Sequence, residues 1–131
     1  MQDVGLSAPV ATATEELQRH LSVIVGPENV RADEATRRLM SEDIWRPVEA
    51  VVALVVASAS TQELIQVVKA VRAAGYAIAP RGAGMSYTGG YVPASDRSVS
   101  LDISRMNRIL RISREDMTVT VEAGASWAAL H

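Results

Sequence analysis

The sequence predicts an α+β fold built from small mixed sheets flanked by helices. An apolar, β-branched run at residues 51–57 is followed by a capped amphipathic segment at residues 60–75, which together read as the start of a β-α-β unit. Several short strand-like segments that look antiparallel come later in the chain, a combination typical of α+β proteins. The chain has 131 residues and is 48% hydrophobic, enough for one compact core.

The N-terminal part is predicted to be a leader followed by a helix. Residues 1–13 are small and polar without a period, whereas Thr14 would cap a helix that has acidic residues in its first turn. Leucines and β-branched residues then share one face until residues 26–27, Gly-Pro, end the helix. Residues 29–45 are mixed and charged, so we expect irregular structure with a short helix at 33–40.

The central helix carries signals at both of its ends. Residues 51–57 predict a buried strand before it. Ser60 and Glu63 then have the spacing of a capping box, in which a hydroxyl and a carboxylate satisfy the first free N–H groups. Gly75 stands where a C-terminal glycine is expected.

The rest of the chain alternates between strands and turns. The predicted strands lie at residues 76–79, 98–103, 109–113 and 118–122. Ser126 then caps a new helix at 127–131. Because a single helical turn has too few hydrogen bonds to hold itself, we expect the sequence to be a piece of a longer protein. An exposed apolar surface is then expected where the remainder docks.

Composition excludes several classes of function. The net charge of −2 gives no electrostatic reason to expect nucleic acid or an anionic membrane as a partner. Cysteine is absent, which excludes disulfides and thiolate chemistry, and the two histidines have no clustered ligands, so no metal site is expected. The apolar run at 50–57 is too short to span a membrane, and no secretory signal is visible, so we expect a cytoplasmic protein.

A glycine-rich loop at residues 80–90 is the strongest chemical signal. Glycine allows positive φ and close approach to a ligand, and successive N–H groups of such a loop can form a nest for phosphate oxygens. Hydroxyls and one cation accompany the glycines. The candidate ligand-binding residues are Pro80, Arg81, Gly82, Ala83, Gly84, Met85, Ser86, Thr88, Gly89 and Gly90.

Two common nucleotide loops do not fit these residues. A P-loop requires a lysine followed by Ser or Thr after its last glycine, and residues 80–90 contain no lysine. The Rossmann fingerprint G-x-G-x-x-G requires a third glycine, where Tyr87 stands, and a helix, where residues 89–93 read as a loop.

Residues 80–90 resemble the first FAD-binding loop of the p-cresol methylhydroxylase and vanillyl-alcohol oxidase flavoproteins, the PCMH-type family. That family includes glycolate-oxidase-like and D-lactate-dehydrogenase-like enzymes. The segments at 55–64, 100–109 and 118–124 are similar to the strands that flank the loop in the family, in the same order. The resemblance implies that residues 42–131 are the N-terminal portion of such an FAD-binding domain, after a leader and helical segment at 1–41.

What the resemblance implies is a flavin-dependent oxidoreductase acting on an alcohol or 2-hydroxy acid. The loop would hold the FAD diphosphate, and a region beyond residue 131 would complete the flavin site and bind the small-molecule substrate. Some members attach the flavin through a histidine placed directly after the second glycine, where this sequence has Met85. We therefore expect non-covalent binding of FAD at this loop.

Two alternatives stay open at the level of sequence. The chain could be a catalytically inactive fragment or interaction module that keeps the fold without the cofactor. The nest could also serve a phosphorylated sugar or another nucleotide, since a diphosphate site alone does not select flavin.

Overall fold

The computed structural model of the chain describes residues 10–45 and 48–130. Its helices are α1 (Val10–Val25), α2 (Glu34–Leu39) and α3 (Thr61–Ala73), with 3₁₀ turns η1 (Pro27–Asn29) and η2 (Trp127–Ala129). Its strands are β1 (Val30–Arg31), β2 (Leu54–Ala57), β3 (Ala77–Arg81), β4 (Ser98–Asp102), β5 (Ile109–Ser113) and β6 (Thr118–Val121). No helix among the described residues is long and apolar enough to cross a membrane.

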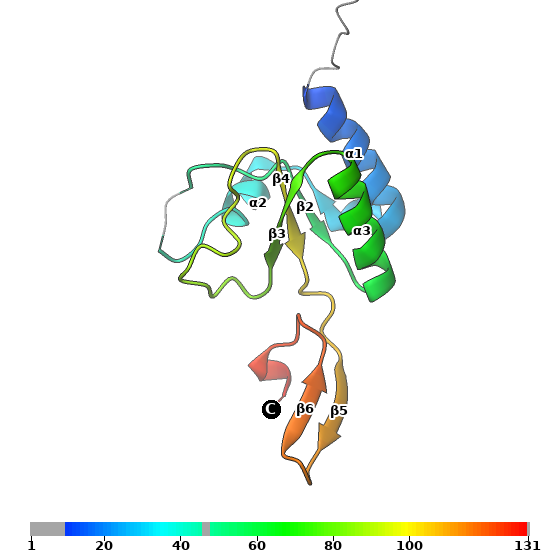
Figure 1. The fold of residues 1–131 in the computed structure, drawn as a ribbon, viewed down its shortest axis with the longest axis vertical. Coiled ribbons are helices and arrows are strands. Elements are labelled where there is room, and N and C mark those ends of the chain that lie inside the picture. Colours follow the sequence, from blue (N-terminus) through cyan, green and yellow to red (C-terminus); the bar gives the residue numbers. More distant parts are fainter. Residues whose placement is uncertain (1–9, 46–47, 131) are drawn as a thin grey trace, which may run out of the picture.

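A four-stranded mixed sheet forms the centre of the molecule, in the order β1-β2-β4-β3 (Figure 1). Strand β4 pairs parallel with both β2 and β3, whereas the short edge strand β1 pairs antiparallel with β2. The predicted α+β class with small mixed sheets is confirmed. The expectation that all the later strands look antiparallel is wrong for β4, because β4 inserts between the two strands of the β-α-β unit.

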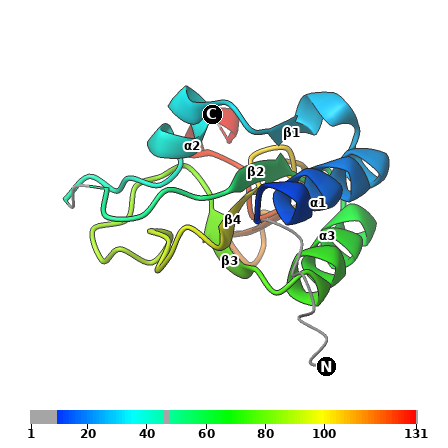
Figure 2. The same cartoon turned by 90° about the horizontal axis from the view of Figure 1, so that it is seen from above.

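The two connections to β3 lie on opposite faces of the sheet. Helix α3 carries the chain from β2 past β4 to β3, and residues 82–97 carry it back to β4. Parallel connections of one hand that run in opposite directions across a sheet must use opposite faces. Both views agree, since α1 and α3 cover one face while residues 82–97 lie with α2 on the other (Figures 1 and 2).

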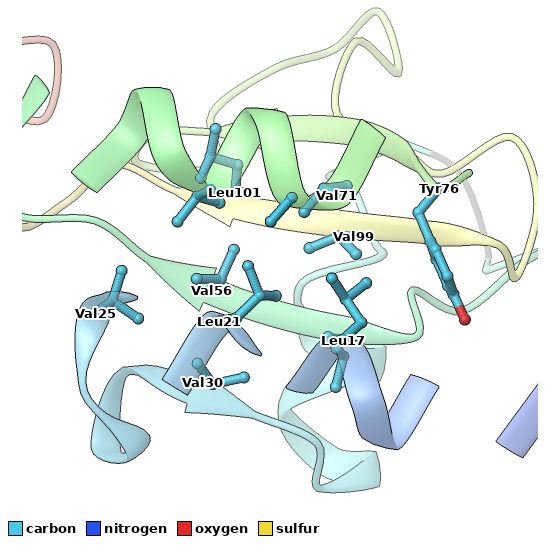
Figure 3. Packing of buried hydrophobic residues seen from close by; sticks show 12 residues of the cluster. Leu17, Leu21, Val25, Val30, Val56, Val71, Tyr76, Val99 and Leu101 are labelled. Carbon is cyan, nitrogen blue, oxygen red and sulfur yellow. The ribbon is translucent and has the colours of Figure 1, made fainter. Parts of the chain in front are cut away.

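The core lies between the helix pair and the sheet (Figure 3). Residues one helical turn apart on α1 and on α3 meet alternate residues of β2 and β4, as the two periods of 3.6 and 2 require. The buried cluster consists of Leu17, Leu21, Val25, Val30, Leu54, Val56, Val67, Ala70, Val71, Tyr76, Val99 and Leu101.

The end signals of α3 act as the sequence predicts. The Ser60 hydroxyl accepts a hydrogen bond from the Glu63 N–H at 3.2 Å, and the Glu63 carboxylate accepts one from the Ala59 N–H at 2.7 Å. Gly75 has a φ of 77°, and its N–H donates to the Arg72 carbonyl. The predicted short helix is also present as α2, where the N-cap Asp33 accepts from the Thr36 N–H at 2.9 Å. Hydrogen bonding with Thr36, first through its side chain and then through its backbone N–H, lowers the pKa of Asp33.

The N-terminal helix begins earlier than the sequence predicts. Helix α1 starts at Val10, so Thr14 is not its N-cap; residues 1–9 of the expected leader lie outside the described residues. The Thr14 hydroxyl instead lies 2.7 Å from the Tyr76 hydroxyl, a tertiary hydrogen bond. The alanines before Thr14 favour helix, which lets α1 extend backward.

Several other boundaries also differ from the predicted ones. The strand expected at 51–57 is regular only from Leu54, and the segment at 29–45, expected to be irregular apart from a short helix, also contains β1. The final helix is only η2, and the Ser126 side chain makes no capping hydrogen bond; residue 131 lies outside the described part. Short-range patterns mark such elements poorly because pairing with β2 decides where β1 forms.

The C-terminal hairpin of β5 and β6 stands apart from the main sheet (Figure 1). Its register pairs Ile112 with Val119 and Ile109 with Val121, whereas Arg111 and Ser113 pair with threonines. Since paired residues share a face, one face of the hairpin is apolar. That face is open, with Ile112 exposed to 66%.

An ion pair closes the base of this hairpin. Arg108 Nη2 donates to Glu122 Oε1 at 2.7 Å, and the Arg108 N–H donates to Glu122 Oε2 at 2.9 Å. These hydrogen bonds hold the pKa of Glu122 below its ordinary value and raise that of Arg108. Next to the pair, the Gly124 N–H donates to the Met106 carbonyl at 2.8 Å and joins the hairpin to the segment that leaves β4.

Candidate functional site

The glycine-rich loop begins at the carboxyl ends of the three parallel strands. The register aligns Ala57 with Asp102 and Arg81 with Asp102, so β2, β3 and β4 end level with one another. Ligands of open α/β sheets bind at this kind of edge, where loops diverge from the strand ends. The same edge faces the C-terminal hairpin in Figure 1.

Two glycines of the loop have a backbone that favours glycine. Gly84 has a φ of 76° and Gly89 a φ of 71°. Gly82 has ordinary φ, and a Cβ built on it would meet no atom within 4 Å, which means that open space lies over it. Gly82 and Gly90 are exposed. Gly84 and Gly89 therefore allow the turns of the loop, and Gly82 leaves its backbone accessible to a ligand.

The backbone N–H groups of residues 82–86 donate no hydrogen bond within the part of the chain that the structure describes. Consecutive free N–H groups in a chain that turns through positive φ form an anion-binding concavity. This run has the chemistry of a phosphate cradle.

The two hydroxyls of the loop bind each other. Ser86 Oγ lies 3.1 Å from Thr88 Oγ1 and accepts the Thr88 N–H at 3.2 Å. This local turn brings both side chains together. Either hydroxyl can be the donor in their contact, so the O–H of the other one can donate to a further partner.

Arg81 is already engaged within the protein. Its Nη1 donates to the Glu42 carbonyl at 2.7 Å, and its guanidinium carbon lies 4.4 Å from the centre of the Tyr91 ring. The Tyr91 hydroxyl in turn donates to the Gly84 carbonyl at 2.8 Å. Sequence reasoning selected Arg81 as a cation beside the nest and missed both of its partners, of which Tyr91 lies just past the loop.

The remaining predicted residues lie along the rim of the loop. Pro80 and Ala83 are exposed, and the Met85 side chain is 68% exposed. The structure therefore gathers all ten predicted residues in one segment at the strand ends. Within the described part of the chain, no group of three or more His, Asp or Glu side chains could hold a metal ion.

A hollow of about 430 Å³ lies beside the end of the loop. Its lining includes Glu49, Thr88, Gly89 and Val92. A carboxylate in that lining disfavours a phosphate there, since like charges repel. The free N–H run at residues 82–86 is therefore the better anion site.

Comparison with known proteins identifies the family of the chain. The family model described as FAD binding domain matches residues 52–131. Glycolate oxidase subunit GlcD of Bacillus subtilis (strain 168) is 31% identical over 111 residues, which are 85% of this chain and 23% of that protein.

Solved structures share the fold over nearly the whole chain. A 4-ethylphenol oxidase from Gulosibacter chungangensis, in complex with isoeugenol, superposes with a TM-score of 0.78 at 26% identity, over 99% of this chain and 25% of that one. A p-cresol methylhydroxylase with substrate bound gives 0.79 at 18% identity, over 96% and 24%. The chain thus spans about a quarter of the length of these relatives, and it belongs to the FAD binding domain family of FAD-linked oxidoreductases.

Proposed function

We propose that the chain is the part of a flavin-dependent oxidoreductase that holds the diphosphate of FAD in the loop at residues 80–90. The observation that carries the proposal is the run of N–H groups at 82–86 that have no acceptor among the described residues, at the carboxyl edge of the parallel strands. A diphosphate has several acceptor oxygens and two negative charges, which suit such a row of donors.

Each of the ten predicted loop residues has a role in this proposal. The backbone of residues 82–86 donates to the phosphate oxygens, and Pro80 and Arg81 lead the chain into the turn. Ser86 and Thr88 offer hydroxyls, and the glycines at 89 and 90 let the chain leave without covering the site. Met85 has no nucleophilic atom suited to a flavin bond, so the cofactor is held non-covalently here.

The flavin, when bound, supplies the redox chemistry by accepting a hydride from the substrate. The similarity to a glycolate oxidase subunit supports an alcohol or 2-hydroxy acid as substrate class. We assign the cofactor function to residues 42–131 and a leader and helical role to 1–41. The substrate site belongs to the part of the relatives that this chain does not span.

A fluorescence titration tests the cofactor assignment directly. FAD added to the chain should lose or shift its fluorescence, and Gly84→Ala should weaken binding because alanine is strained at a φ of 76° and its Cβ would lie 2.6 Å from Arg81 Nη2. Gly75→Ala is the matched control, since it has a similar φ of 77° at the opposite end of the sheet. It should lose comparable stability and bind FAD as the parent does.

Two outcomes would change the assignment. FAD fluorescence unaltered by an excess of folded chain would contradict cofactor binding and favour an interaction module that keeps the fold alone. Equal competition by ADP and FAD, with no preference for the flavin compound, would favour a general nucleotide binder.

A further inference from the structure

Arg81, Tyr91 and Gly84 form a closed set of contacts at the root of the loop, which we name the Arg81–Tyr91 clamp. The guanidinium stacks on the Tyr91 ring at 4.4 Å, and the Tyr91 hydroxyl donates to the Gly84 carbonyl at 2.8 Å. The guanidinium also lies against Gly84, because a Cβ there would come within 2.6 Å of Nη2. Gly84 is thus held from two sides.

The clamp has a firm attachment to the rest of the fold. Tyr91 is buried, and Arg81 is the last residue of β3, where its carbonyl accepts the Ile103 N–H at 3.1 Å. Arg81 Nη1 also donates to the Glu42 carbonyl, 39 positions earlier in the chain. The clamp therefore connects the middle of the glycine-rich loop to the end of β3 and to the segment after α2.

The orientation of the Gly84 peptide is the chemical consequence. Its carbonyl oxygen accepts a hydrogen bond from the side chain of the buried Tyr91, so it is directed toward Tyr91 and away from a ligand at the loop surface. A carbonyl facing the ligand would repel phosphate oxygens. The N–H groups of residues 82–86, which have no acceptor within the described part of the chain, can instead donate to them. Such preorganisation removes part of the ordering cost of binding.

We infer that Arg81 and Tyr91 are positioning residues that preset the loop for a diphosphate, and that Arg81 acts through Gly84 and not as a phosphate ligand. The inference rests on the proposed FAD site. It differs from the simple view of Arg81 as a cation beside the phosphate, because that view assigns no role to the Tyr91 hydroxyl.

Three variants test the clamp. Tyr91→Phe removes only the hydroxyl, and Arg81→Lys keeps the charge but loses the planar stacking surface. Tyr87→Phe is the matched control, because Tyr87 is 65% exposed in the same loop and makes no hydrogen bond among the described residues. The hydrogen-exchange rates of the loop amides, measured without ligand, show how firmly the clamp holds the loop. Titrations with FAD and with riboflavin measure its effect on binding.

We expect Tyr91→Phe and Arg81→Lys each to speed exchange at residues 82–86 and to lower FAD affinity roughly three- to tenfold. Riboflavin, which has no diphosphate, should bind all variants equally, so the preference for FAD falls by the same factor. The double variant should bind FAD about as well as the single variant with the lower affinity, since both substitutions act through Gly84. Tyr87→Phe should behave as the parent in every measurement.

Unchanged loop exchange in both variants would overturn the clamp even if FAD binds. Full FAD affinity in Arg81→Lys, with loss only when the charge is removed as in Arg81→Met, would overturn it in favour of a phosphate-side cation. Failure of the parent chain to bind FAD would overturn the proposed function, while the exchange data would still decide whether the clamp exists.

Discussion

The central mixed sheet and the C-terminal hairpin are built from similar residues but differ in what covers them. Both are rich in valine, isoleucine and leucine, yet Val99 of β4 is fully buried while Val119 of β6 is 40% exposed. The sheet lies between two helices and a long loop, whereas the hairpin has one apolar face open to solvent (Figures 1 and 2). A two-stranded hairpin is at best marginally stable alone, so stability should concentrate in the sheet.

The largest expected effect comes from a matched pair of leucines. Leu21→Ala removes a side chain with no exposed surface and should cost about 2–5 kcal/mol of unfolding free energy. Leu110→Ala removes a side chain that is 54% exposed and should cost less than about 0.5 kcal/mol. Chemical denaturation of both variants measures the difference. Equal losses would contradict the contrast between the two regions.

The next largest loss of stability is expected at Gly124, which joins the hairpin to the segment that leaves β4. A Cβ on Gly124 would collide with the Ile103 carbonyl oxygen and lie 2.8 Å from that of Met106, so Gly124→Ala should cost about 1–3 kcal/mol. Gly82→Ala, at a site with open space, is the control and should change thermal stability little. An unaltered melting temperature for Gly124→Ala would show that the joint can relax.

Replacing the serine before a helical turn should cause a smaller loss of stability, which two positions allow us to compare. Ser60 caps α3, so Ser60→Ala should cost about 1 kcal/mol. Ser126 makes no capping hydrogen bond before η2, so Ser126→Ala should be nearly neutral. Thermal melts of the two variants compare a cap in the packed region with its counterpart beside the hairpin. A greater loss at Ser126 would reverse the ranking of the regions.

The smallest effect concerns the pH dependence of the hairpin. Glu122 has its pKa lowered by Arg108, so its stabilising contribution is present above the ordinary value of 4.5 and is lost as the pH falls through its folded pKa. Glu122→Gln should therefore be slightly less stable than the parent at neutral pH. The difference should disappear well below pH 4.5, as melts at the two pH values can measure. If Glu122→Gln stays less stable than the parent in acid, the loss of stability comes from altered packing and not from the lost charge.

Local signals in the sequence predicted several backbone features well. The four glycines of the loop, the Ser60–Glu63 capping box and Gly75 are readable because each acts on residues within a few positions. The parallel position of β4 and the role of Tyr91 were not readable. Each depends on which distant segments meet, as the contact between Arg81 and the Glu42 carbonyl illustrates.

The sequence by itself determined the α+β class, the helix ends of α3 and the glycine loop, because backbone conformation and capping are short-range properties. Only the tertiary structure decided that β3 and β4 end level and that Arg81 stacks on Tyr91. It also decided that the amides of residues 82–86 find no acceptor among the described residues. Those features arise from packing between segments far apart in the chain, and packing cannot be read from the order of residues alone.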